Sequence, residues 1–179
     1  MISLPWRRDN RTGLWLVYDF RMLNPDGSVK WKRRVVPNRL FNTAELAALE
    51  TLYSAVAFPS SILYGRLYNT TPVDTSTLTT LSALEMTGNG YAAIAWDRDG
   101  TDWTSAVTLG SGEGEKVGVI GTYTASGGSI GPFTFFVMAT TSNNSGIGWS
   151  YVGFGSAQTI AAGASLQVRP RARLRGVSV

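Results

Sequence analysis

The stretch Leu14-Trp15-Leu16-Val17-Tyr18-Asp19-Phe20 decides how the fold begins, because its β-branched, aromatic and apolar residues favour an extended strand. Asn24-Pro25-Asp26-Gly27 follows as a strong turn signal, and residues 28–36 return with one face more basic than the other. This pattern predicts a β-hairpin. Because an isolated two-stranded ribbon is only marginally stable, we expect the hairpin to pack on another structure, for which a second chain is one candidate. We assign residues 1–37 to a basic β-hairpin arm.

The rest of the chain has the pattern of short strands joined by tight turns. From Ser61 onward, clusters of Gly, Asn, Ser and Asp separate apolar and β-branched runs at spacings typical of a sandwich or barrel. The predicted strands are residues 61–69, 91–97, 104–109, 116–124, 132–140, 148–155 and 165–175. We expect an all-β fold, with residues 38–179 forming an antiparallel β-sandwich or jelly-roll-like domain.

One short helix is predicted at the start of this domain, between Pro37 and Pro59. Asn42 suits the N-cap with Glu45 three residues later, and Phe41 suits a hydrophobic staple with Leu46. Four large apolar residues fall on one face of the helix: Leu46, Leu49, Tyr53 and Val56. We therefore expect this face to pack against the sheet.

Composition narrows the chemistry that the chain can perform. Its 179 residues are enough for one domain with a buried core, and they include no Cys and no His. Disulfides, thiolate nucleophiles and histidine bases are therefore impossible, and an enzyme would have to use carboxylates, Lys or Tyr. No run approaches the roughly 18 apolar residues of a membrane span, and the N-terminal stretch lacks the apolar core of a signal peptide, so we expect no Sec export.

Charge is strongly segregated along the chain. Residues 1–39 carry nine basic and three acidic side chains, residues 40–168 carry three basic and nine acidic ones, and residues 169–179 carry four Arg and no acid. The four last Arg alternate along the predicted strand 165–175, so they should share one face of a sheet. Such asymmetry constrains the partners of a protein more than its fold.

The basic segments supply the candidate docking residues: Lys30, Lys32, Arg33, Arg34, Arg169, Arg171, Arg173 and Arg175. A basic face can dock on an acidic protein surface, contact nucleic-acid phosphates, or keep an edge strand solvated. The central region is acidic and has no recognisable RNA- or DNA-binding motif. We therefore favour a protein interface over nucleic acid.

Two short motifs resemble ligand sites but fit turns better. Asp97-Arg98-Asp99-Gly100-Thr101-Asp102 lacks the residue order of a calcium-binding loop, and we interpret it as a turn between strands that end at Trp96 and begin near Trp103. Gly110-Ser111-Gly112-Glu113-Gly114-Glu115-Lys116 lacks the Gly before Lys and the Ser or Thr after it that a phosphate loop needs. We expect no catalytic residue, no metal site and no cofactor.

Several motifs together resemble a known group of proteins. They are Asn38-Arg39-Leu40-Phe41-Asn42, Leu63-Tyr64-Gly65-Arg66-Leu67-Tyr68-Asn69, then Leu78, Leu81 and Glu85, Gly88-Asn89-Gly90-Tyr91-Ala92, Phe135-Phe136-Val137-Met138-Ala139-Thr140-Thr141 with Ser145-Gly146, and Thr159-Ile160-Ala161-Ala162-Gly163-Ala164-Ser165-Leu166. In order and spacing, this stretch is similar to small virion structural proteins of tailed bacteriophages, of the tail-fibre, baseplate or head-decoration type. One departure is that Ala93 and Ile94 stand where such proteins often place an Arg.

The resemblance implies a non-enzymatic virion protein on the exterior of the capsid or tail. Its partners would be other virion proteins, and it would be a homo-oligomer such as a trimer, located in a virion assembled in the host cytoplasm. The basic terminal segments would then be docking elements. The alternative hypothesis is a carbohydrate-binding module for the host surface that uses exposed Trp and Tyr rings as a sugar platform.

Overall fold

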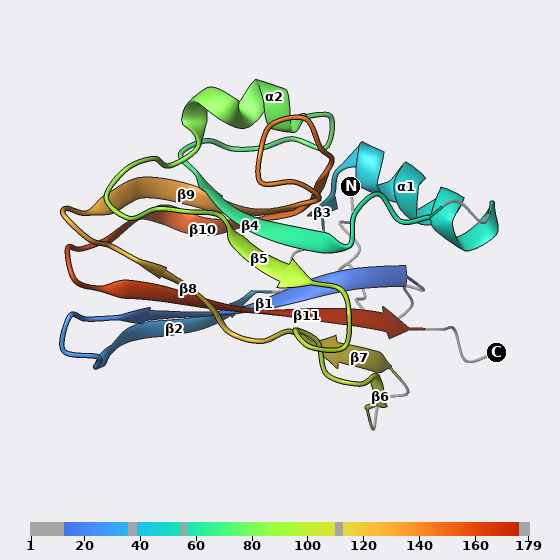
Figure 1. Ribbon diagram of the computed structural model, residues 1–179, viewed down its shortest axis with the longest axis horizontal. Coiled ribbons are helices and arrows are strands. Elements are labelled where there is room, and N and C mark those ends of the chain that lie inside the picture. Colours follow the sequence, from blue (N-terminus) through green and yellow to red (C-terminus); the bar gives the residue numbers. More distant parts are fainter. Residues whose placement is uncertain (1–12, 36–38, 55–56, 110–112, 176–179) are drawn as a thin grey trace, which may run out of the picture.

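The computed structural model describes residues 13–35, 39–54, 57–109 and 113–175, and its regular structure is mostly β (Figure 1). Sheet A has the strand order β2-β1-β11-β7-β6, and β8 also pairs with β11. Its strands are β1 (Gly13–Leu23), β2 (Val29–Val35), β6 (Val107–Thr108), β7 (Gly114–Val117), β8 (Gly121–Thr124) and β11 (Ser165–Arg175). Every strand pair in this sheet is antiparallel.

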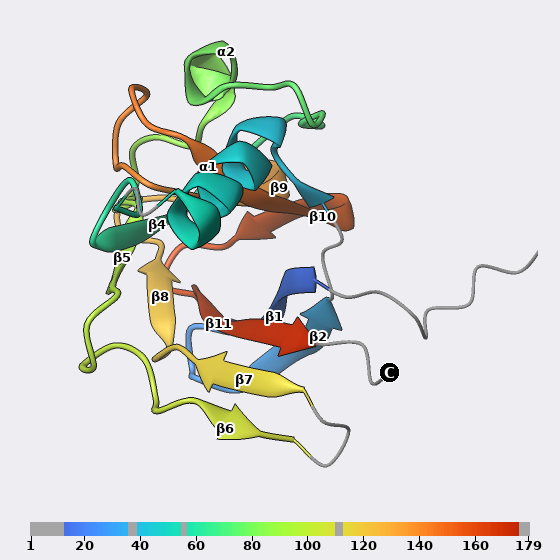
Figure 2. The ribbon, with the colours of Figure 1, turned by 90° about the vertical axis from the view of Figure 1, so that its right-hand side faces the viewer.

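Sheet B is also antiparallel and has the order β3-β10-β9-β4-β5. Its strands are β3 (Arg39–Leu40), β4 (Ile62–Tyr68), β5 (Ile94–Asp97), β9 (Ile130–Ala139) and β10 (Gly148–Ile160). Two short α-helices, α1 (Asn42–Tyr53) and α2 (Leu78–Leu81), and a single 3-10 turn (Ser82–Leu84) complete the described elements. Figures 1 and 2 show that both helices lie on the side of sheet B that faces away from sheet A.

The core lies between the two sheets and is rich in aromatic rings. Tyr18 and Phe20 project from β1 toward Phe136 of β9, with ring centroids 4.9 and 5.5 Å away in edge-to-face arrangements. Phe20 also contacts Phe154 of β10 at 4.8 Å. The Tyr18 hydroxyl is 2.5 Å from Oγ of Ser150, so the phenol keeps a hydrogen-bond partner although it is buried. The two sheets therefore share one core.

The N-terminal hairpin forms as predicted, but it is not an arm. β1 pairs with β2 across the turn, where Gly27 has φ +80°. On its other edge β1 pairs with β11 from Gly13 to Leu23, which places the hairpin inside sheet A. The expectation of a separate arm over residues 1–37 is wrong for the described part, because the second edge of β1 and its apolar face are both satisfied within this chain.

Helix α1 forms at the predicted place, but the side that packs against the sheet is opposite to the predicted one. Leu46, Leu49 and Tyr53 are 64%, 54% and 82% exposed, whereas Ala44 is fully buried. The small alanine side lets the helix backbone approach the sheet closely, and this turns the large apolar side chains outward. The predicted packing face is therefore wrong, and so is the staple between Phe41 and Leu46. Val56 lies outside the described residues.

The N-terminus of α1 also differs from the prediction. The N-cap residue is Phe41, no side chain caps the helix, and Asn42 is the first helical residue. The carbonyl of Phe41 accepts hydrogen bonds from the backbone N–H groups of Ala44 and Glu45 at 2.9 and 3.1 Å. Phe41 is fully buried and packs against Tyr151, with 4.9 Å between ring centroids. Burial of the Phe41 ring therefore fixes where the helix begins.

Most predicted strands are present, but their bounds change where the backbone cannot pair. Strand 165–175 has the predicted bounds, whereas the predicted strand 116–124 is divided into β7 and β8. Pro170 lies opposite this break and has no N–H to donate, although its carbonyl accepts from Gly118 at 2.8 Å. The segment 118–120 therefore leaves the ladder, and Val119 pairs with Asp102 instead.

A buried ion pair fixes the long crossover between β4 and β5. The Arg66 side chain is 1% exposed and forms a two-pronged salt bridge with Glu85, with an Nε–Oε1 distance of 2.9 Å. Its Nη1 and Nη2 groups also donate to the Asn143 carbonyl and the Asn144 amide oxygen, both at 2.7 Å. Burial and the charge of Glu85 raise the pKa of Tyr91, so its hydroxyl stays protonated and donates to Glu85 at 2.7 Å.

We predict that Glu85→Gln lowers the free energy of unfolding by about 3–5 kcal/mol, because it leaves the guanidinium of Arg66 buried without a compensating charge. Urea denaturation at pH 7 measures this change. The matched control is Glu50→Gln on the exposed surface of α1, which should shift the free energy by no more than about 0.5 kcal/mol. Equal, small effects of the two substitutions would show that the ion pair does not anchor the crossover.

Candidate docking surface

The outer face of sheet A is built by strand alternation, which sends every second side chain away from the core. The register places two rows of polar side chains across β2, β1 and β11. One row is Arg34, Asp19 and Arg169, and the next row is Lys32, Arg21 and Gln167. The hairpin β1-β2 and strand β11, which are far apart in the sequence, thus form one continuous surface.

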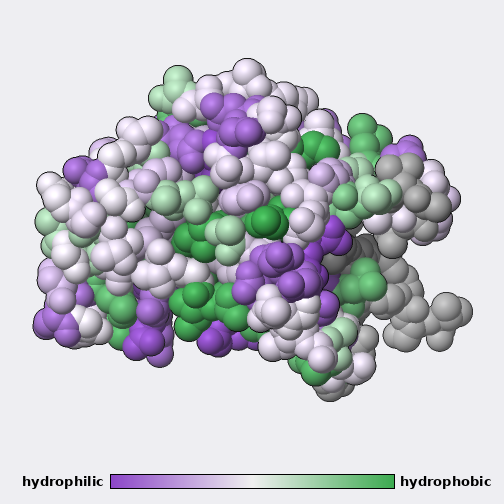
Figure 3. Space-filling model, in the orientation of Figure 1, coloured by the Kyte–Doolittle hydropathy of each residue, from purple (hydrophilic) through white to green (hydrophobic). Residues whose placement is uncertain are grey.

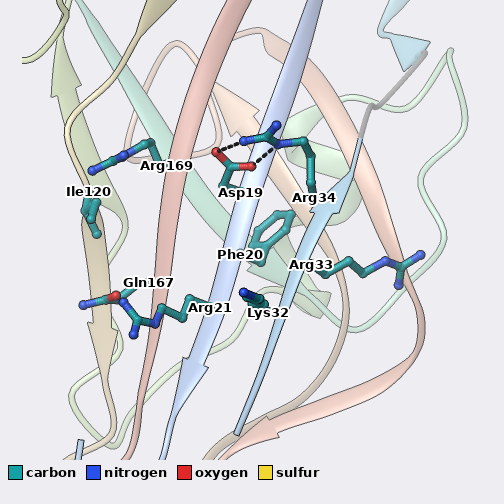
Figure 4. Close-up of a pocket in the computed structure, with 9 residues that line it drawn as sticks. All are labelled: Asp19, Phe20, Arg21, Lys32, Arg33, Arg34, Ile120, Gln167 and Arg169. Atoms are coloured by element: carbon teal, nitrogen blue, oxygen red, sulfur yellow. Dashed lines mark hydrogen bonds and ion pairs between the residues drawn. The ribbon is translucent and has the colours of Figure 1, made fainter. Parts of the chain in front are cut away.

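This surface contains a shallow depression of about 550 Å³ (Figure 4). Its lining residues come from β1, β2, β11 and the segment between β7 and β8: Asp19, Phe20, Arg21, Lys32, Arg33, Arg34, Ile120, Gln167 and Arg169. We call this the basic depression, because five of these nine side chains are cationic and one is anionic. A concave surface of one sign concentrates its field on ligands of the opposite sign.

Asp19 lies among these cations and binds two of them. Its carboxylate accepts from Nε of Arg34 at 2.5 Å and from Nε of Arg171 at 2.7 Å. Partial burial raises the pKa of the Asp19 carboxyl, but the hydrogen bonds and positive charges of the two arginines outweigh burial, so this pKa lies below its ordinary value. Asp19 therefore stays ionised and holds the arginines in place.

Arg171 and Arg173 are paired within the chain rather than free. Glu115 of β7 is only 5% exposed and accepts from Nη1 of Arg171 at 3.2 Å and from Nη2 of Arg173 at 3.0 Å. Arg173 also lies 3.6 Å from an oxygen of Glu113. Arg169, Arg171 and Arg173 do share one face, as predicted, but Arg171 and Arg173 donate to the glutamates at positions 113 and 115.

The other predicted docking residues fall into different positions. Within the described part of the chain, Lys32 and Arg169 have no carboxylate partner and border the basic depression, whereas Lys30 is exposed outside it. Arg33 alternates with Lys32 and Arg34 along β2, and its side chain donates to the Phe154 carbonyl at 2.6 Å. Arg34 is paired with Asp19 but remains 56% exposed. The side chain of Arg175 lies outside the described residues.

Sequence reasoning missed Arg21, which lies in the basic depression without a carboxylate partner in the described residues. It was missed because it stands alone just after the predicted strand 14–20 and belongs to no run of charged residues. The sequence could have placed it on the same face as Asp19, because residues two apart on a strand point to the same side of the sheet. The opposite residue on β11, Gln167, could not be paired with it before the register was known.

The acidic turn 97–102 and the tryptophans give little support to a metal site or a carbohydrate site. The carboxylates of the turn accept local hydrogen bonds; Asp102, for example, accepts one from the backbone N–H of Asp97 at 2.7 Å. In the described residues, no group of three or more acidic side chains is placed to hold a metal ion. Trp96, Trp103 and Trp149 are buried, so they are not the exposed rings that carbohydrate stacking needs, whereas Tyr53 of α1 is 82% exposed.

Comparison with known proteins adds no further assignment. No protein-family model, no curated protein and no solved structure matches this chain. Neither described helix is long and apolar enough to cross a membrane.

We predict that Asp19→Asn reduces the loss of stability in acid. Because the folded-state pKa of Asp19 is depressed, its contribution is present above the unfolded-state value of about 4 and is lost as the pH falls through the folded-state pKa. The difference in unfolding free energy between the wild type and the variant should therefore be constant above about pH 5 and shrink as the pH falls further, through the depressed folded-state pKa. Denaturation curves at several pH values test this, and a difference that does not shrink in acid would contradict it.

We also predict that Arg171→Met combined with Arg173→Met destabilises the fold. Removal of both partners leaves the carboxylate of Glu115 buried and unpaired, at a cost of about 1–3 kcal/mol or more. The matched control is Arg169→Met on the same strand face, where no ion pair is lost and the change should stay within about 0.5 kcal/mol. If all three arginines prove equally dispensable for folding, the internal pairing is not stabilising.

Proposed function

We propose that this chain is a non-enzymatic structural protein that docks on an acidic partner surface through the outer face of sheet A. The observation that carries the proposal is the basic depression, where Arg21, Lys32 and Arg169 border one concave surface without carboxylate partners in the described residues. Charge of one sign on such a surface accelerates encounter with an acidic partner and fixes the register of docking. Asp19 and Glu115 keep neighbouring arginines in place around it.

A protein partner suits this surface better than a nucleic acid. Ile120, 45% exposed, gives one side of the basic depression an apolar contact, and Gln167 adds a neutral hydrogen-bonding group. Phe20 is the aromatic lining residue, but it is only 2% exposed, so it offers no platform on which bases could stack. A mixture of cationic, amide and apolar groups is typical of a protein interface.

The chemistry of the surface supports binding rather than catalysis. The sequence contains no His and no Cys, which are the commonest bases and nucleophiles at active sites. The carboxylates near the basic depression, Asp19 and Glu115, are engaged by arginines in pairs that stabilise the sheet. Their arrangement supplies fixed charge but no positioned acid or nucleophile.

The proposed setting rests on the resemblance of the sequence motifs to tailed-phage virion proteins. Arg66, Glu85 and Tyr91 come from three of the resembling motifs, and they meet in one buried network beside Asn143. The shared motifs therefore serve the fold. We propose a β-sandwich or jelly-roll-like subunit, present in several copies on the exterior of a capsid or tail, with the basic depression turned toward a neighbouring virion protein.

We predict that Arg21→Glu, Lys32→Glu and Arg169→Glu together abolish binding to virions or capsids assembled without this chain. The wild type should bind them with an affinity that falls as salt is raised, because exposed charges are screened. Co-sedimentation at two salt concentrations measures both effects. The control is Lys30→Glu with Lys116→Glu, which reverses two exposed cations outside the basic depression. Equal losses in both variants would indicate general charge attraction and contradict the proposed site.

A further inference from the structure

Helix α1 presents a large apolar stripe to the surroundings. Leu46, Leu49 and Tyr53 are spaced by three and four residues, so they lie on one side of the helix, and each is more than half exposed. The opposite side contains the buried Ala44 and rests on β10. Soluble proteins seldom expose adjacent large apolar side chains on one helix face unless that face binds something.

The stripe is flanked by negative charge. Glu45 and Glu50 are exposed, and the sequence of α1 contains no Lys or Arg. The C-terminal end of a helix also carries partial negative charge, and Tyr53 stands at that end. The occupant of this face must therefore combine apolar contact with positive charge.

The basic depression has this combination. Arg21, Lys32 and Arg169 provide positive charge, and their aliphatic stems add apolar area. Ile120, 45% exposed, provides the apolar part at the break between β7 and β8. Val119, the residue before it, is also 45% exposed. Figure 3 shows hydrophobic side chains at the surface over this segment, next to hydrophilic ones.

The two surfaces cannot meet within one molecule. Helix α1 covers the outside of sheet B, while the basic depression is on the outside of sheet A, and Figure 2 shows both sheets between them. We propose that the α1 face of one copy docks on the basic depression of a second copy, head to tail. This inference rests on the proposed function, because it names a partner for the same surface.

A contact between two α1 helices fits the charges less well. It would bring Glu45 and Glu50 of one copy against the same residues of the other, and no basic side chain of the helix could offset them. Like charges across an interface disfavour that pairing. A head-to-tail contact joins two different surfaces, so it can repeat into a ring or an open stack. A copy at one end keeps its basic depression for another virion protein.

Charge exchange between two variants tests the proposal. The first variant carries Glu45→Lys and Glu50→Lys, which makes both of its surfaces basic, and the second carries Arg21→Glu, Lys32→Glu and Arg169→Glu, which makes both acidic. The wild type should associate as its concentration rises. For each variant alone, the dissociation constant for self-association should be at least about tenfold higher. In an equimolar mixture every α1 face again meets a depression of opposite charge, so association should return. Sedimentation velocity measures the masses, and far-UV circular dichroism checks folding.

A second pair of variants tests the apolar part of the contact. Leu49→Ser should weaken self-association of the wild type, whereas Leu84→Ser, at an exposed leucine away from α1 and the depression, should not. Both side chains are exposed, so neither change should alter the fold substantially.

Three results would overturn the head-to-tail contact: a wild type that stays monomeric, a mixture that associates no better than its components, or a first variant that associates like the wild type. The virion-binding assay separates this failure from that of the proposed function. The first variant keeps its basic depression and should still bind virions, whereas the second should not. If the head-to-tail contact is wrong but the proposed function is right, binding to virions should still depend on the basic depression.

Discussion

The pairing of β1 with β11 is the constraint on which the rest of the molecule depends. It runs in register from Gly13 with Arg175 to Leu23 with Ser165, and it joins two chain segments about 150 residues apart. On its inner side it places Tyr18 and Phe20 against Phe136 and Phe154 of sheet B. On its outer side it brings the basic side chains of the hairpin β1-β2 beside those of β11. One ladder of backbone hydrogen bonds thus sets both the core and the charged surface.

That surface holds like charges close together, and it does so with a few carboxylates. Asp19 and Glu115 each bind two arginines, which offsets repulsion between strands that would otherwise be strongly cationic. The same logic operates in sheet B, where Glu85 compensates the buried charge of Arg66. In both places the ion pairs stabilise the arrangement mainly because breaking them would leave a poorly solvated charge. Within the basic depression, the described cations Arg21, Lys32 and Arg169 have no carboxylate partner and remain for another molecule.

The segregation of charge along the chain becomes segregation between two opposite faces. The outer face of sheet A is predominantly basic, whereas helix α1, on the outside of sheet B, exposes Glu45 and Glu50 beside its apolar stripe. A molecule with opposite surfaces of this kind has complementary ends, and copies of it can line up in one direction. This polarity connects the proposed docking role with assembly from several copies, because each added copy presents a fresh surface of each kind.

The sequence by itself determined the local elements: the hairpin about Asp26 and Gly27, the helix after Phe41, and the strand 165–175 with its alternating arginines. These follow from turn residues, strand propensity and periodicity, which act over a few residues. Only the tertiary structure decided that the hairpin belongs to sheet A, that α1 turns Leu49 outward, and that Arg171 pairs with Asp19 and Glu115 whereas Arg169 does not. Each of these depends on which distant segment fills the neighbouring position. A free edge, a close approach by alanine and an ion pair all require partners that local sequence does not specify.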